Sequence, residues 1–351
     1  MNAIQARIEA LRQYAPSIAA PDDLEAFWAR ACREADASAA YSAIQPAASP
    51  FRQAQVFNVV YAGAAGTPVH AWFLLPPDPL QQPVPCVVVF HGYSLSRGQP
   101  EDHAAWLLMG YAVLAVDVRG QGGDTGNGLP QTCGMAKGWI TQGILDPERS
   151  YYRAIAIDAL RAVRCAMALP EVDPARVFAF GASQGGGLAL LAAALAPGLR
   201  AAIAHVPNMC HMDLGIMQSV GSISEAADFA ARFPDRLNDV LRTLGYFDIA
   251  NLADRIALPV NVTVGLKDNT CLPETIFAAY NRIASPAKSI EVHPFMGHAM
   301  PPGYYAAAHA FYSRLSRSFA VLRELADDPD DRISMRPSPS KTPLTSADLA
   351  T

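Results

Sequence analysis

The spacing of apolar positions along the 351-residue chain changes at about residue 84. After that point, short apolar runs of strand length alternate with longer segments whose apolar residues recur at helical spacing. Continuous apolar strands that alternate with helices form mostly parallel sheets covered on both faces. The pattern therefore predicts a doubly wound α/β fold. The predicted strands are 84–90, 111–118, 177–181, 201–206, 259–265 and 289–295, and the clearest helices are 152–169 and 186–196.

The first part of the chain has a different pattern. Residues 1–36 show two helical segments, and the second opens with Pro21, Asp22 and Asp23, whose side chains suit a helix N-terminus. Two β-like runs follow at 54–63 and 67–76, joined by small residues, as in a hairpin. We expect an N-terminal helical and hairpin addition to the main sheet.

Two further segments depart from the alternation. A long polar and helical connection, 208–255, lies before the strand at 259–265 and predicts a helical insertion, either a cap over the site or an oligomer contact. Residues 325–351 are polar and rich in Pro and Ser, which is typical of a flexible tail. The prediction is one domain over 1–324 followed by a C-terminal tail.

Composition narrows the class of protein. Hydrophobic residues make up 51% of the chain and charged residues only 17%, so a large core can be buried. The net charge of −5, with Lys and Arg never in blocks, argues against nucleic acid and favours a small-molecule partner. No uninterrupted apolar run is long enough to span a membrane, and the N-terminus lacks the pattern of a secretory signal. We therefore expect a cytoplasmic enzyme.

The sequence offers no good cofactor or metal motif. Six cysteines stand singly, which in a reducing compartment favours unpaired thiols over disulfides. Cys210, His211 and Asp213 are close together, but their spacing matches no metal-ligand motif. The glycine-rich run 120–128 is not followed by the long helix of a dinucleotide site. The prediction is no cofactor and no metal.

The sharpest chemical signal is GASQG at 181–185, which follows a predicted strand and opens a small-residue helix. In this arrangement a serine occupies a strained turn, and the flanking glycines allow backbone and helix to approach closely. Ser183 would stand at the carboxyl edge of the sheet beside helix N–H groups that can stabilise an oxyanion. This predicts a nucleophilic serine.

The serine needs a base and an orienting carboxylate, which follow it in this chain order. Asp268 comes just after the predicted strand 259–265, at the correct edge of the sheet. Asp248 and Asp254 are competing acids, but they lie before that strand in a segment with helical spacing, where helix caps or surface charges are expected. Asp268 is the preferred acid.

The base is chosen by the same reasoning. His298 follows the strand 289–295 and a glycine, in the loop at the edge where Ser183 and Asp268 are expected. His293 falls inside that strand and His309 in a helical pattern beyond the loop, so both are expected to be structural. His298 is therefore the predicted base.

The oxyanion hole is expected at two backbone N–H groups. The first belongs to Gln184, which follows the serine, and the second comes from the loop after the first strand, where Tyr93 is the candidate. The alternative for Tyr93 is simple loop packing. These residues predict a serine hydrolase; a peptidase or lactone hydrolase on the same fold, or a non-catalytic hydrolase-like binding protein, are the alternatives.

Several longer motifs together resemble the acetyl xylan esterase and cephalosporin C deacetylase family, carbohydrate esterase family 7, of the α/β-hydrolase superfamily. The resemblance runs over nearly all of residues 1–320. It rests on the segments FHGYSLSRG, DVRGQGGDTG, TQGILDPERSYYRAIAIDALRAV, FGASQGG, TLGYFDIANLADRI and GLKDNTCLPETIFAAYN. The RGQ and GxSQG pair is far more specific than GxSxG alone.

The resemblance implies a serine carboxylesterase that removes acetyl groups from acetylated xylo-oligosaccharides and from cephalosporin C. Ser183, Asp268 and His298 match the family's nucleophile, acid and base. Tyr93 and Gln184 match its oxyanion donors, and Arg119, Gly120 and Gln121 its structural RGQ element.

The resemblance also bears on assembly. Family members are usually intracellular hexamers, built as trimers of dimers. They carry glutamate after the catalytic histidine, where this chain has Ala299. That glutamate is associated with local structure and assembly, so the substitution concerns the predicted homo-oligomer and leaves the triad intact.

Overall fold

The computed structural model describes residues 1–37, 39–77, 82–132 and 138–327, with side chains described as far as residue 315. The chain divides into two compact units, Met1–His309 and a smaller one that begins at Ala310. The first unit contains the whole sheet and all the predicted site residues. The helix α10 (Tyr304–Asp327) passes the predicted domain boundary, and the rest of the predicted tail lies outside the described residues.

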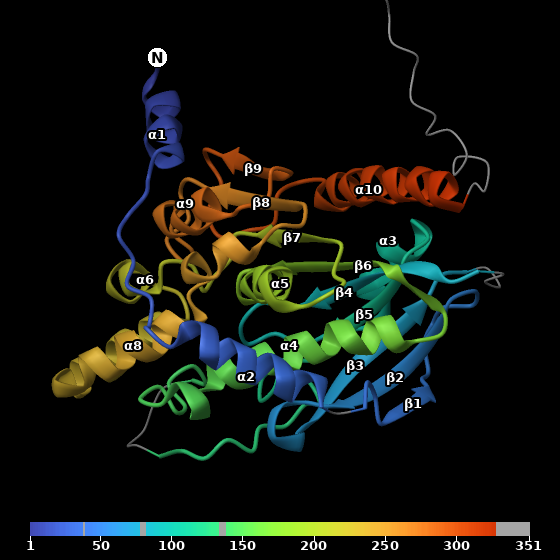
Figure 1. Ribbon diagram of the computed structural model, residues 1–351, viewed down its shortest axis with the longest axis horizontal. Coiled ribbons are helices and arrows are strands. Elements are labelled where there is room, and N and C mark those ends of the chain that lie inside the picture. Colours follow the sequence, from blue (N-terminus) through green and yellow to red (C-terminus); the bar gives the residue numbers. More distant parts are fainter. Residues whose placement is uncertain (38, 78–81, 133–137, 328–351) are drawn as a thin grey trace, which may run out of the picture. The chain divides into compact units, whose positions relative to one another are not determined.

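One nine-stranded sheet forms the centre of the first unit (Figure 1), in the order β1-β2-β3-β5-β4-β6-β7-β8-β9. From β5 to β9 the neighbouring strands are parallel, and β1, β2, β3 and β5 pair antiparallel at one end. The mostly parallel α/β prediction is confirmed. The strands are β1 (Ala43–Pro46), β2 (Gln55–Ala62), β3 (Pro68–Leu75), β4 (Val84–Phe90), β5 (Ala112–Val116), β6 (Val172–Ala182), β7 (Ala201–His205), β8 (Val260–Gly265) and β9 (Lys288–His293).

Each predicted strand has a counterpart, and β1 is the strand that the pattern did not predict. Its four residues are intermediate or exposed, so they carry no alternation of buried and exposed positions to read. The predicted hairpin is the antiparallel pair β2 and β3.

Helices cover the sheet and form the insertion. α4 and α5 pack against the sheet and against each other, and α2 lies along α4 (Figure 1). α6, α7 and α8 make up the predicted insertion. In addition to α10, the helices are α1 (Ala3–Arg12), α2 (Leu24–Asp36), α3 (Ala104–Leu108), α4 (Tyr151–Ala168), α5 (Gln184–Leu195), α6 (Met212–Gln218), α7 (Ser224–Arg232), α8 (Leu237–Phe247) and α9 (Pro273–Arg282).

Capping, burial and an ion pair hold the helix α4 against the sheet. Ser150 caps it by accepting a hydrogen bond from the Arg153 N–H, and most of its residues are buried. Its buried Asp158 holds the Arg119 guanidinium through two oxygens, at 2.6 and 2.7 Å. This bidentate pair joins α4 to the loop after β5.

The parallel strands bring their carboxyl ends to one edge of the sheet. In register, Phe90 at the end of β4 pairs with Gly181 of β6, and Gly265 of β8 pairs with His293 of β9. The loops after β4, β6, β8 and β9 therefore start at this common edge, where ligand sites form in open α/β sheets.

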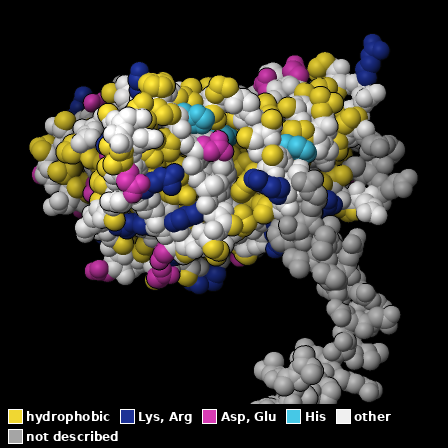
Figure 2. Space-filling view, turned by 90° about the horizontal axis from the view of Figure 1, so that it is seen from above, with side chains coloured by type: hydrophobic (Ala, Val, Ile, Leu, Met, Phe, Trp, Pro, Cys, Tyr) yellow, Lys and Arg dark blue, Asp and Glu magenta, His cyan; other side chains and the backbone are white. Residues whose placement is uncertain are grey.

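On the side seen in Figure 2, Lys and Arg are scattered among acidic, polar and apolar side chains. Among the described helices, none combines the length and apolar character needed to cross a bilayer.

Candidate active site

Ser183 occupies a strained turn between β6 and α5. Its φ of 56° and ψ of −121° lie in a region that residues with a Cβ seldom adopt. Two hydrogen bonds hold the turn: the Ser183 N–H donates to the His205 carbonyl at 2.9 Å, and the Ser183 carbonyl accepts from the Asn208 N–H at 2.9 Å. The turn presents the serine, which is only partly buried, at the carboxyl edge of the sheet.

The glycines around the serine are required by close backbone approach. A Cβ on Gly181 would lie 2.2 Å from the Gly185 carbonyl oxygen, and one on Gly185 would lie 2.0 Å from that of Phe90. Added Cβ atoms on Gly186 and Gly187 would meet the backbone of the segment after β7. GASQG is therefore a packed strand-to-helix turn, as the sequence predicted.

His298 and Asp268 form the second part of the site. The Asp268 carboxyl group is buried, and its Oδ2 lies 2.8 Å from Nδ1 of His298. Its Oδ1 accepts the N–H groups of Thr270 and Cys271, at 2.8 and 2.9 Å. Because the carboxylate engages Nδ1–H, Nε2 of His298 is left as the proton acceptor.

The acid and base loops are built against each other. The Lys267 N–H donates to the Met296 carbonyl at 3.0 Å, and a Cβ on Gly265 would lie 2.4 Å from that oxygen. Glycine at 265 thus permits the contact that brings His298 to Asp268. The His298 side chain remains 29% exposed, so a substrate can reach it.

The other histidines considered from the sequence lie elsewhere. His293 ends β9, where its carbonyl accepts the N–H groups of Leu266 and Met296. His309 packs edge-on against Tyr111, with ring centroids 6.0 Å apart. The histidine that lies against Asp268 is His298.

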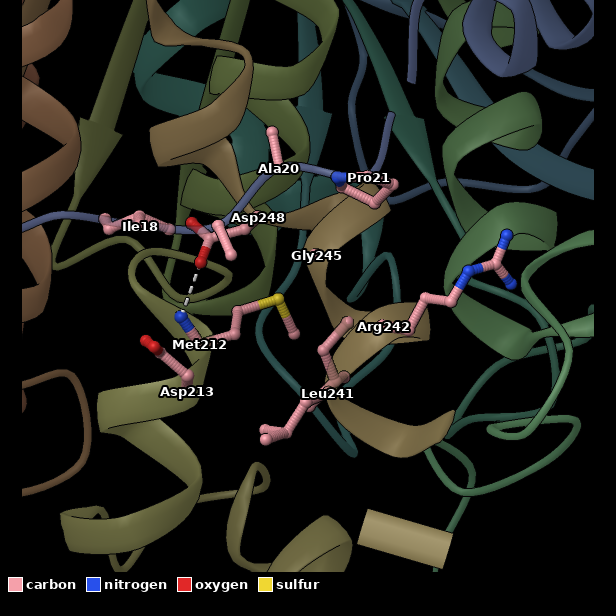
Figure 3. Close-up of a pocket in the computed structure, with 11 residues that line it drawn as sticks. Ile18, Ala20, Pro21, Met212, Asp213, Leu241, Arg242, Gly245 and Asp248 are labelled. Atoms are coloured by element: carbon pink, nitrogen blue, oxygen red, sulfur yellow. Dashed lines mark hydrogen bonds between the residues drawn. The ribbon is translucent and has the colours of Figure 1, made fainter. Parts of the chain in front are cut away.

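The competing acids have structural surroundings. The buried Asp248 accepts the N–H groups of His211, Met212 and Ala250, and burial raises its pKa to about 6. Figure 3 shows it beside a cavity of about 270 Å³ between the Ile18–Pro21 segment and the insertion, with Met212 bonded to it. Asp254 is exposed.

The two predicted oxyanion residues flank the serine. Gln184 is the first residue of α5, so its N–H points out of the helix end. A Cβ on Gly92 would lie 3.8 Å from Ser183 Cβ, which places the loop that carries Tyr93 against the nucleophile. The loop that carries Tyr93 and the first turn of α5 therefore both adjoin Ser183.

The RGQ residues connect these donors. Gln121 Oε1 accepts the Ser94 N–H at 2.8 Å, while its Nε2 donates to Gln184 Oε1 at 2.8 Å and to the Tyr151 hydroxyl at 2.9 Å. Gly120 adopts a φ of 73°, which suits its tight turn. Together with the Arg119–Asp158 pair, these contacts join the run to α4, to α5 and to the loop after β4.

Three neighbours of the site were missed from the sequence. The Tyr93 hydroxyl donates to both carboxylate oxygens of Glu225 and accepts from the Trp139 N–H. Burial is the main cause of the raised pKa of Tyr93. Cys271 lies within hydrogen-bonding reach of the Ser183 side chain, and burial raises the pKa of its thiol. No sequence motif identifies Glu225, Trp139 or Cys271 as site neighbours, because their contacts join segments that are far apart in the chain.

The described residues hold no group of three or more His, Cys, Asp or Glu side chains arranged to bind a metal ion. Cys210 and His211, considered from the sequence, make other contacts. The Cys210 thiol lies 3.5 Å from the Asn208 carbonyl, and His211 Nε2 lies 3.1 Å from Asp213.

A serine in a strained strand-to-helix turn, with a His–Asp pair at the same edge of a mostly parallel sheet, defines the α/β-hydrolase class. Comparison with known proteins narrows the class. The family model described as acetyl xylan esterase (AXE1) matches residues 1–315. The chain belongs to this family, and the family places it among the carboxylic ester hydrolases.

Solved structures give the same result. An acetyl xylan esterase from Paenibacillus sp. R4 is 36% identical with a TM-score of 0.83, over 88% of this chain and 99% of that one. Acetyl xylan esterase 1 from Thermoanaerobacterium sp. JW/SL YS485 is 32% identical with a TM-score of 0.82, over 88% and 98%.

A curated relative matches over a shorter stretch. The acetyl esterase Axe7A of Xylanibacter ruminicola is 32% identical over 154 residues, which is 44% of this chain and 34% of that protein. The matched region thus spans about a third of that relative's length.

Proposed function

We propose that the protein is a serine carboxylesterase that removes acetyl groups from small substrates, namely acetylated xylo-oligosaccharides and cephalosporin C-like acetyl esters. The observation that carries the proposal is the 2.8 Å contact between Asp268 Oδ2 and His298 Nδ1, at the edge of the sheet where the strained turn of Ser183 also lies. The family and the substrate named for its solved relatives support the choice of an acetyl ester.

The first half of the reaction forms an acetyl-enzyme. Nε2 of His298 takes the proton of Ser183 Oγ while the serine attacks the ester carbonyl, and Asp268 stabilises the resulting imidazolium. The N–H groups of Tyr93 and Gln184 hold the oxyanion. The imidazolium returns its proton to the leaving alcohol, and an acetyl group remains on Ser183.

The second half repeats these roles with water. His298 removes a proton from a water molecule, whose oxygen attacks the acetyl-serine carbonyl. Collapse of the second tetrahedral intermediate returns the proton to Ser183 Oγ and releases acetate.

A polar hollow beside the site supports a sugar-like alcohol. It has a volume of about 580 Å³ and shares Gln121 and Trp139 with the surroundings of the oxyanion loop. Asn127, Gln131 and Gln142 also line it. Asp124, which pairs with Arg97, lines it as well. Amide groups, a carboxylate and an aromatic ring can all bind sugar hydroxyls or sugar faces.

A short acyl group is supported by the acetyl esters named for the family and for its solved relatives. We expect aryl acetate to be turned over faster than aryl butyrate, and a peptide anilide not at all.

Replacement of the nucleophile tests the proposal. Ser183→Ala should lower turnover of an aryl acetate about 10⁴- to 10⁶-fold, because no acetyl-enzyme can form. Ser289→Ala, an exposed serine of β9, is the matched control and should keep wild-type turnover. Residual activity of Ser183→Ala within about tenfold of wild type would rule out the assignment.

Assembly and location complete the proposal. We propose a homo-oligomer that acts in the cytoplasm on a small-molecule ester, with no nucleic acid and no membrane as partner. The family resemblance supports the oligomer, and the scattered charge on the face shown in Figure 2 supports a small-molecule substrate over a nucleic acid.

A further inference from the structure

We propose that Glu225 is a positioning residue that fixes the oxyanion-hole loop through the side chain of Tyr93. The inference rests on the proposed function, because it assigns a role within the same acyl-transfer site. Glu225 lies on α7 of the insertion, 132 positions from Tyr93 along the chain. Its two carboxylate oxygens lie 3.0 and 2.9 Å from the Tyr93 hydroxyl.

The Glu225 carboxylate is buried and closely surrounded. Glu225 is 8% exposed, and a carboxylate is buried at little cost only where hydrogen bonds satisfy it. Gly138 lies against this carboxylate, since a Cβ there would lie 2.2 Å from a Glu225 oxygen, and its φ of 71° favours glycine. The carboxylate is thus enclosed between Tyr93 and the backbone at Gly138.

The Tyr93 hydroxyl acts as both a donor and an acceptor at this point. It donates to Glu225 and accepts from the Trp139 N–H at 2.9 Å. The Tyr93 ring also meets Trp139 edge-on, with centroids 5.2 Å apart. Through these contacts Glu225 and Trp139 together hold the hydroxyl end of the ring, and Glu225 is the partner from the insertion.

The tether reaches the reaction through the Tyr93 backbone. On one side of the Tyr93 peptide, Ser94 has a φ of 66° and its N–H is held by Gln121. On the other side, Gly92 lies against Ser183. With the ring fixed at its far end, the direction of the Tyr93 N–H is set before substrate binds. An oxyanion donor is effective because it is already oriented.

The distinguishing test is Glu225→Gln, which keeps the shape of the side chain and removes its charge. We expect kcat for an aryl acetate to fall about 10- to 100-fold while KM stays within about threefold, because the oxyanion exists only after attack. The affinity for an arylboronic acid, which forms a tetrahedral adduct with the serine, should fall in parallel with kcat. Asp228→Asn, an exposed carboxylate on the same helix, should match wild type in both.

Tyr93→Phe tests the same bond from the other side and keeps the ring against Trp139. It should show the same pattern, and the double variant should lose no more than Tyr93→Phe alone, since both changes break one interaction. Equal kcat and boronate affinity in Glu225→Gln and wild type, or additive losses in the double variant, would overturn the proposal. If Glu225→Gln does not fold, full kcat in Tyr93→Phe overturns it.

Failure of the proposed function gives a different result. In that case the wild type itself would show no aryl acetate hydrolysis that Ser183→Ala abolishes, and the role of Glu225 would fall with the esterase assignment. A Ser183-dependent wild type with an unimpaired Glu225→Gln contradicts only the positioning role.

Discussion

At the scale of single residues, motif and chain order predicted Ser183 as the nucleophile, Asp268 as the acid and His298 as the base. In the structure, Asp268 Oδ2 lies 2.8 Å from His298 Nδ1. These positions could be read because each follows a recognisable strand. Glu225 could not, since nothing local distinguishes it from a surface carboxylate on an amphipathic helix.

Asp268→Asn tests the acid directly. The amide can still accept the Thr270 and Cys271 N–H groups, but its Nδ2 would face His298 and favour the wrong tautomer. We expect kcat for an aryl acetate to fall about 10³- to 10⁴-fold with little change in thermal stability.

The rejected candidate Asp254 is the control, because it is exposed outside the site. Asp254→Asn should keep wild-type kcat. A large loss in Asp254→Asn with an active Asp268→Asn would reverse the assignment.

At the scale of elements, the strands and the helical insertion were predicted from the spacing of apolar residues. The hydrogen bonds between the end of the insertion and the segment after β7 were not predicted. Val206, Met209 and His211 all have positive φ in the segment that follows β7. Asp248, at the far end of the insertion, accepts the His211 and Met212 N–H groups and so holds this strained segment. Such a contact depends on three-dimensional placement that periodicity does not encode.

The raised pKa of Asp248 makes its contribution to the free energy of unfolding depend on pH. Burial raises the pKa to about 6, so the folded state binds this proton more tightly than the unfolded state. The contribution favours folding at low pH and is lost as pH rises through about 6.

Relative to Asp248→Asn, which does not titrate, the free energy of unfolding of the wild type should therefore fall by roughly 1 kcal/mol between pH 5 and pH 8. Denaturant unfolding of both proteins at the two pH values measures the difference. A gap that stays constant or grows in favour of the wild type as pH rises would contradict this role.

At the scale of the whole molecule, composition and alternation were enough to predict one large mostly parallel α/β fold, because both depend on local sequence. Assembly is different, since it depends on surfaces that only another copy would reveal. Ala299 is exposed directly after the predicted base, at the position where the family resemblance implies a glutamate.

We predict that the wild type forms a homo-oligomer and that Ala299→Glu increases the hexameric share. The introduced carboxylate restores the group associated with assembly, while kcat per subunit stays close to wild type because residue 299 takes no part in proton transfer. Size-exclusion chromatography with mass measurement of both proteins gives their oligomeric states and tests the prediction. A monomer for both proteins would contradict the prediction.

The central claim is that an acetyl group passes through Ser183. Its most direct test is acid quenching of the wild type during steady-state turnover of an acetyl ester, followed by peptide mass analysis. We predict one added acetyl group on the peptide that contains Ser183, absent from Ser183→Ala treated in the same way. Continued turnover with no adduct, or with an adduct on another residue, would contradict the account.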